Sequence, residues 1–229
     1  MNLNSALREL KRHGTAQNRK VYRRHGVGEN MYGVSFADLR ALAKHIKTDH
    51  ALALQLWATG NHEAQVLATL IADPDQFDAK TLDAWAKDLS NYTITDEFVG
   101  LVTRTAYRQK KAEKWHKAQG EWIGRAGWHL IGQLALHDAA LPDSYFEEYL
   151  SEIATSIHIR KNRVREAMNN TLIAIGIRDG YLQEKALEVA RTIGPVEVDH
   201  GETNCRTPDA ATYILKTIAR KQYKSAKVT

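Results

Sequence analysis

Cysteine, proline and long apolar runs are all scarce in this chain of 229 residues. Cys205 is the one cysteine, so these residues can form neither an intramolecular disulfide nor a zinc cage built of cysteines. The 4 prolines and 14 glycines exclude collagen-like, proline-rich and low-complexity classes. No apolar run approaches the roughly 20 residues that span a bilayer, and residues 1–14 lack a signal-peptide core. We therefore expect a cytoplasmic protein with no membrane partner.

Charge is distributed in blocks along the chain, whose net charge is +5 and whose sequence pI is about 9.2. Basic residues greatly outnumber acidic ones between Arg8 and Lys47, and residues 104–125 are basic again. The stretch from His129 to Ile157 contains no Lys or Arg at all. This alternation favours a protein with one basic face whose partner is a polyanion. Solvated helix surfaces remain the alternative explanation of the same pattern.

Apolar residues recur at helical spacing along most of the chain. The expected helices are residues 35–46, 51–57, 62–71, 82–89, 94–102, 122–136, 142–157, 164–177, 181–193 and 209–218. Ser35 and Asp38 have the spacing of a capping box, and Gly124, Gly127 and Gly132 are expected to break the helix over 122–136. Short connectors between helices favour stacked antiparallel pairs, as in an all-α solenoid of HEAT or armadillo type. A globular helical bundle is the alternative.

Two loop segments could suggest a ligand site. Gly26–Gly33 is rich in glycine, but it has neither a preceding strand nor the Lys-Ser/Thr pair of a P-loop, so we expect a turn between helices. His200, Glu202 and Cys205 are too few and too mixed to indicate a metal site. We expect no metal and no cofactor, and we expect an ordered loop here that caps the stack, with Pro208 at the first position of the last helix.

Several motifs, in order and at consistent spacing, resemble one family. They are the runs Tyr32–Lys44, Leu54–Trp57, Gly60–Ala68, Ser90–Asp96 and Trp122–Gly127. Together they resemble the bacterial DNA alkylation repair proteins of the AlkD type, which are HEAT-like-repeat DNA glycosylases. The resemblance covers most of residues 22–193. It leaves residues 194–229 outside the pattern, as a C-terminal extension or capping segment of a single domain over 1–229.

This resemblance implies an all-α superhelical stack of antiparallel helix pairs with a concave basic groove for duplex DNA. It also implies that the protein hydrolyses the N-glycosidic bond of N3- and N7-alkylated purines in base excision repair. The expected partner is double-stranded DNA carrying such lesions, and we expect a monomer.

Residue by residue, the resemblance assigns the candidate active site. Asp96 matches the family's catalytic aspartate, and Tyr92 takes a position that is often Trp. Arg125 matches an arginine that faces the DNA backbone near the lesion. Asn170 stands where a second Trp commonly sits, and this departure leaves open a non-catalytic binder of damaged or branched DNA with the same fold. A HEAT-like scaffold that binds protein is a further alternative.

The chemistry expected of Asp96 is coherent without the family. Tyr92 and Asp96 are four residues apart, so on a helix they share one face. An alkylated purine is already cationic and leaves without much help from an acid, while positive charge develops on the deoxyribose. A carboxylate about 4 Å from that charge contributes about 4 kcal/mol at an effective dielectric constant near 20. This corresponds to roughly a thousandfold in rate.

Two clusters of cations are candidate phosphate contacts. The first comprises Arg160, Lys161, Arg163 and Arg165, at the start of a helix that also bears Asn170; the second comprises Arg19, Lys20, Arg23 and Arg24. Cations near a helix N-terminus oppose its dipole, so phosphate contact explains the first cluster better than stability does. Solvated surface is the alternative for part of it.

Overall fold

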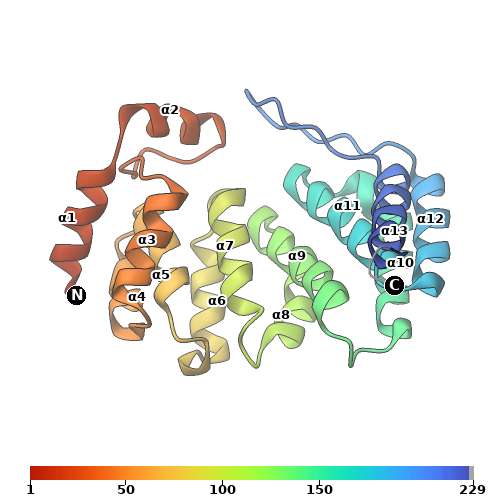
Figure 1. Cartoon of the computed structure of the whole chain (residues 1–229), viewed down its shortest axis with the longest axis horizontal. Coiled ribbons are helices and arrows are strands. Elements are labelled where there is room, and N and C mark those ends of the chain that lie inside the picture. Colours follow the sequence, from red (N-terminus) through yellow and green to blue (C-terminus); the bar gives the residue numbers. More distant parts are fainter. Residues whose placement is uncertain (227–229) are drawn as a thin grey trace. The chain divides into compact units, whose positions relative to one another are not determined.

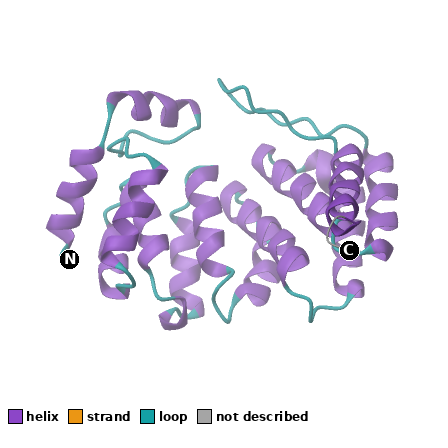
Figure 2. Ribbon diagram, viewed as in Figure 1, coloured by secondary structure: helices purple, strands orange, loops and turns teal. Residues whose placement is uncertain are grey.

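The computed structural model describes residues 1–226, and all regular secondary structure there is helical (Figures 1 and 2). These residues form thirteen α-helices and two short 3-10 helices, with no strand. This confirms the all-α fold class. The described chain divides into two compact units: unit 1 is Met1–Lys110 with His200–Asn204, and unit 2 is the remainder. The proposal that residues 1–229 form a single domain stays a prediction.

Unit 1 is built of seven helices and the first residues of an eighth. Its helices are α1 (Leu3–His13), α2 (Ala16–Arg24), α3 (Phe36–Ile46), α4 (His50–Ala58), α5 (His62–Ile71), the 3-10 helix η1 (Pro74–Gln76), α6 (Ala79–Lys87) and α7 (Tyr92–Val102). Ser35 caps α3 as expected, because its hydroxyl accepts the Asp38 N–H at 3.1 Å. Helix α5 packs against α3, α4 and α7, and every residue of α5 but Leu70 is buried. The core of unit 1 therefore forms around α5.

An aromatic cluster fixes the position of α7 within unit 1. The rings of Trp57 and Trp85 stack with centroids 4.0 Å apart, and Phe98 of α7 lies 5.7 Å from Trp57. Phe98 is fully buried. Because Phe98 faces this cluster, the start of α7 is held in one orientation, and that part of the helix carries Tyr92 and Asp96.

Unit 2 begins within α8 (Arg108–Trp115) and contains the remaining helices. These are α9 (Glu121–His137), α10 (Asp143–Ser156), the 3-10 helix η2 (Ile157–Ile159), α11 (Asn162–Gly176), α12 (Gly180–Ile193) and α13 (Ala210–Ala226). Helices α9 and α11 form the most extensive pair, and α10, α12 and α13 pack around α11. Of the helices in residues 1–226, none has the length and apolar character required to cross a membrane.

The glycines of α9 allow close packing and do not interrupt the helix, so the expectation that they break it was wrong. Helix α9 runs unbroken from Glu121 to His137. A Cβ at Gly127 would overlap the backbone of Trp115 and His116. Intrinsic helix propensity is a weak signal that packing overrides, and here the missing side chain lets another backbone segment approach α9.

The last helix begins later than its sequence suggests. Asp209 caps α13, because its carboxylate accepts the Thr212 N–H at 2.8 Å, and the helix begins at Ala210. Pro208 therefore precedes the cap, and the expectation that it occupies the first helical position was wrong. Its carbonyl oxygen accepts a hydrogen bond from Asn169 of α11 at 3.0 Å.

A buried carboxylate organises the loop between α2 and α3. Glu63 is fully buried on α5 and accepts the backbone N–H groups of Tyr32, Gly33 and Val34 at 2.5–3.1 Å. Gly33 has φ of 85°, which a residue with a side chain adopts only with strain. The carbonyl oxygen of Val34 also accepts the Tyr22 hydroxyl of α2. Residues 26–33 thus form an inter-helix connection as expected, and the loop holds α2 in place.

We predict that Gly127→Ala destabilises the protein, because the added methyl group lies only 2.6 Å from His116 Cα and meets rigid backbone. The loss in the free energy of unfolding should be about 2–3 kcal/mol, measured by urea denaturation. Gly100→Ala is the matched control, since a Cβ at this exposed position in α7 meets nothing within 4 Å. The control should be neutral or stabilise by about 0.5–1 kcal/mol.

We also predict that Glu63→Gln lowers the free energy of unfolding by about 3 kcal/mol, because it leaves buried N–H groups without a good acceptor. Glu29→Gln removes the same charge from an exposed carboxylate, which pairs with Arg23, and should leave the free energy of unfolding nearly unchanged, because solvent screens an exposed ion pair. Equal losses for the two variants would contradict an organising role of Glu63.

Candidate nucleic-acid interface

Helix α2 presents four exposed cations. Arg19, Lys20, Arg23 and Arg24 are all exposed on this short helix. Arg23 forms a bidentate ion pair with Glu29, at 2.6 and 2.9 Å. Lys20, Arg23 and Arg24 line one hollow in unit 1 together with Gly26 and Glu202. The predicted second cluster therefore forms a real basic surface, whose contact with phosphates stays a proposal.

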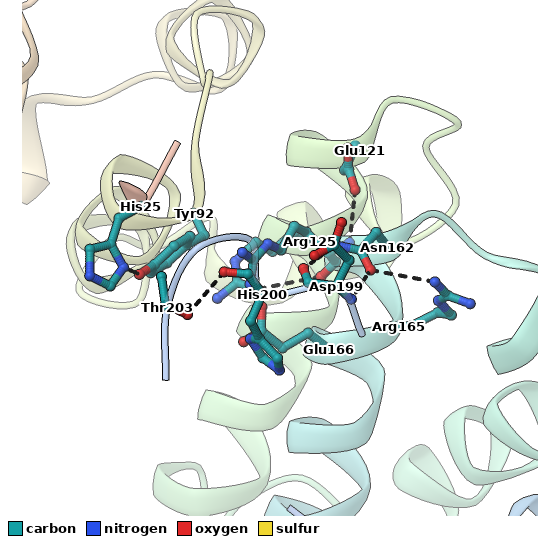
Figure 3. A network of polar contacts seen from close by, with 11 residues as sticks. His25, Tyr92, Glu121, Arg125, Asn162, Arg165, Glu166, Asp199, His200 and Thr203 are labelled. Atoms are coloured by element: carbon teal, nitrogen blue, oxygen red, sulfur yellow. Dashed lines mark hydrogen bonds and ion pairs between the residues drawn. The ribbon is translucent and has the colours of Figure 1, made fainter. Parts of the chain in front are cut away.

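Glu202 gives this basic surface an acidic edge. It lies in His200–Asn204, the part of the C-terminal segment that belongs to unit 1. The sequence predicted a loop that caps the stack, and the hydroxyl of Thr203 donates to the carbonyl oxygen of His200 at 2.9 Å within this loop (Figure 3). The carboxylate beside three cations lowers the positive potential of the hollow.

Tyr92 and Asp96 lie on α7 as the sequence predicted. Asn91 caps this helix by accepting the Ile94 N–H at 3.1 Å, so Tyr92 is the first helical residue and Asp96 follows one turn later. The Tyr92 hydroxyl is hydrogen-bonded to Nδ1 of His25, and their rings meet edge to face (Figure 3). His25 immediately follows α2. This contact ties the basic helix to the helix that bears the candidate catalytic carboxylate.

A second carboxylate adjoins Asp96. Burial raises the pKa of Glu97, Arg40 opposes that rise, and the charge of Asp96 adds to it. Proton uptake by Glu97 is thus favoured relative to an exposed glutamate, and the charge of Asp96 contributes to a negative potential at this turn of α7. Both side chains are only partly accessible.

Arg125 is held inside unit 2. Its exposed fraction is 4%, and its Nη1 atom donates to Glu166 at 2.7 Å and to the carbonyl oxygen of Arg163 at 3.3 Å. Figure 3 shows the contact between Arg125 and Glu166. Glu166 also pairs with Arg163 at 3.0 Å. Arg125 therefore joins α9 to the first turns of α11. Its assignment as an arginine that faces DNA stays a prediction.

The first cluster is engaged mainly in internal contacts. Arg160 donates to the carbonyl oxygens of His116 and Ala118, at 2.7 and 3.4 Å, and is only 18% exposed. Arg163 is 13% exposed, and its own backbone N–H donates to Glu121 at 2.8 Å. These two cations hold the start of α11 in place.

The remaining members of the cluster are more accessible. Lys161 is exposed at the cap of α11, and Arg165 is partly exposed and donates to Asn162 at 3.4 Å. Asn170 is exposed on the same helix. Unit 2 therefore offers Lys161, Arg165 and Asn170 at its surface, while Arg125, Arg160 and Arg163 make contacts within the unit. Contact of this cluster with phosphates stays a prediction.

Sequence reasoning missed three residues that shape these surfaces: His25, Glu166 and Glu202. Glu166 carried a signal, because a carboxylate within a run of arginines is an obvious ion-pair partner. His25 carried none, and Glu202 drew notice only as a weak candidate metal ligand, because each meets its neighbours from a distant part of the sequence. Within residues 1–226, the histidine, cysteine and acidic side chains form no group of three that could hold a metal ion.

Comparison with known proteins identifies the family of this chain. The model of the family described as DNA alkylation repair enzyme matches residues 6–214. Uncharacterized proteins of Listeria innocua and Listeria monocytogenes are each 28% identical to this chain, over 86% of it and 88% of their own length.

A solved structure is also similar to nearly the whole chain. It is described as "a new family of proteins related to the HEAT-like repeat DNA glycosylases with affinity for branched DNA structures". Its TM-score is 0.89 at 30% identity, over 96% of this chain and 95% of that one. The predicted HEAT-like helical fold is thereby confirmed, and the chain belongs to the DNA alkylation repair enzyme family.

Proposed function

We propose that the protein binds branched DNA as a monomer and that the exposed cations of α2 contact its phosphates. The observation that carries the proposal is the basic surface of α2, in a chain that is 30% identical to a solved protein described as having affinity for branched DNA. Charge contact with phosphates supplies essentially all of the affinity of non-specific DNA binding and orients the protein without reading sequence. A protein that recognises the shape of DNA and not its sequence can bind mainly through such phosphate contacts.

The charges of α2 favour a polyanion over a protein partner. Within residues 1–226, Arg19, Lys20 and Arg24 have no ion-pair partner, and all three side chains are exposed. Unpaired cations on one short helix repel one another, so they do not stabilise the fold. Phosphate groups would neutralise them. Lys161 and Arg165 offer a second, smaller contact on unit 2.

Excision of alkylated purines in base excision repair is the second candidate function, and Asp96 favours it. Its carboxylate shares one face of α7 with Tyr92, and the family is described as a repair enzyme. In this proposal Asp96 stabilises the cationic deoxyribose and orients water, while Tyr92 contacts the nucleotide. Arg125 acts as a positioning residue through Glu166. The exposed Asn170 offers no aromatic face, so excision would depend on the lability of the N3- or N7-alkylated base.

We predict that the protein binds a four-way DNA junction more tightly than a linear duplex of the same length. Replacing Lys20 and Arg24 together by Ala should weaken binding to both DNAs. The slope of log K against log salt should fall in magnitude by about 0.9 for each phosphate that the variant no longer neutralises. Fluorescence anisotropy titrations at several salt concentrations measure both quantities.

The matched control replaces two exposed lysines of α6, Lys80 and Lys87, by Ala. It removes the same net charge and should leave the slope nearly unchanged. Equal slopes for wild type and the α2 variant would remove α2 from the interface. Equal affinity for junction and linear duplex would refute the preference for branched DNA.

We predict that Asp96→Asn lowers the release of 7-methylguanine from alkylated DNA by roughly two to three orders of magnitude. The substitution keeps the size of the side chain and removes its charge, so DNA binding should hold or improve. Glu97→Gln is the matched control, because it removes the neighbouring carboxylate from the same turn. Release at the wild-type rate by Asp96→Asn would exclude Asp96, and no release by wild type would leave binding as the function.

A further inference from the structure

Helix α13 has an outer face on which aromatic and basic side chains are exposed. Its inner face is anchored by Ile214, which is fully buried, and by Lys221, whose Nζ donates to the carbonyl oxygen of Ile177 at 2.7 Å. The opposite side carries two tyrosines, Tyr213 and Tyr223, that are 50% and 63% exposed. Tyrosine is enriched at binding interfaces, because it offers an apolar ring together with a polar hydroxyl.

The same side of α13 also carries cations. We call the following set the α13 outer face: Tyr213, Lys216, Arg220 and Tyr223. Their spacing of three, seven and ten residues places them within about 80° of one another around the helix. Lys216, Arg220 and Tyr223 line one hollow together with Ala219. Aromatic and basic side chains therefore share a single stripe.

The charge of the helix is of one sign. Residues 210–226 contain four basic residues and no acidic residue. The positive charge disfavours a basic partner and favours an anionic one. The tyrosines add a requirement for flat, apolar surfaces at regular intervals, because an aromatic ring contributes most when another ring stacks on it.

Single-stranded nucleic acid meets both requirements. Its unpaired bases stack on exposed aromatic side chains, and its phosphates pair with neighbouring cations. Base-paired DNA offers the phosphates but hides its base faces. Tyr213 and Tyr223 are ten residues apart, which is about 15 Å along the helix axis. A strand of a few nucleotides spans that length.

We propose that the α13 outer face binds a single-stranded arm of DNA, with bases stacked on Tyr213 and Tyr223 and phosphates on Lys216 and Arg220. This inference rests on the proposed function, because those branched DNAs that carry a flap or a fork supply such an arm beside the duplex. The family model ends at residue 214, so most of this face lies beyond the part of the chain that it matches.

The test is binding of a labelled oligothymidylate to the full chain, measured by fluorescence anisotropy. Replacing Tyr213 and Tyr223 together by Ala should weaken this binding by about tenfold for each tyrosine, while the corresponding Phe variant retains it. Replacing Lys216 and Arg220 by Gln should reduce the salt slope by about 0.7 for each phosphate left without its cation. Binding of linear duplex should be unaffected by the tyrosine changes.

Tyr181→Ala is the matched control. Tyr181 of α12 is 51% exposed and also lies beside a cation, with Lys185 Nζ 4.9 Å from its ring centroid, but its hydroxyl donates to Glu147 at 3.0 Å. A base that stacked there would meet a carboxylate, so this variant should bind oligothymidylate as wild type does. An equal loss of affinity in the control would overturn the assignment to α13.

Further outcomes separate this proposal from the proposed function. A protein that binds the four-way junction but not oligothymidylate would overturn the role of α13 and leave the function standing. A protein that binds neither DNA would overturn both. Tyrosine-dependent binding to phosphatidylglycerol vesicles, with no binding to oligothymidylate, would assign the face to a lipid surface and refute the proposal.

Discussion

The carboxylate of Glu63 is the contact on which the basic surface of unit 1 depends. A buried charge is tolerated only where hydrogen bonds replace its water, and three consecutive N–H groups of the loop before α3 do so. In return, the carboxylate fixes the path of that loop, which continues from α2. This loop in turn positions the cations of α2 and the ring of His25, which lies beside Tyr92. The basic surface is thus organised from within the core.

Local patterns in the sequence predicted most of the fold. The helical spacing of apolar residues marked ten of the helices, and Ser35 with Asp38 marked the start of α3. Two local features misled the prediction, for different physical reasons. Gly127 looked like a breaker because propensity is local, whereas the backbone that packs against it comes from α8 and the residue after it. Pro208 looked like a helix start, whereas Asp209 caps α13 more effectively.

The candidate sites were less predictable. Whether a charged side chain is exposed or bound within the fold depends on the groups that surround it in space, and these come from distant parts of the sequence. The sequence treated the four cations at the start of α11 alike, yet Arg160 and Arg163 bind carbonyl oxygens and Glu166 while Lys161 faces solvent. Arg125 shows the same limit, since its partner lies forty-one residues further along the chain. The pairing of Tyr92 with Asp96 was predictable because a single helix turn joins them.

Unit 1 is not a continuous stretch of chain, and this has a consequence for dissecting the protein. Unit 1 comprises residues up to Lys110 and a second, short segment, His200–Asn204. A gene fragment that stops at residue 110 would therefore encode the cations of α2 without Glu202, the carboxylate that lines their hollow. Its product would carry a more positive surface than the intact protein has. Affinities measured on such a fragment would overstate how readily the whole chain adheres to nucleic acid.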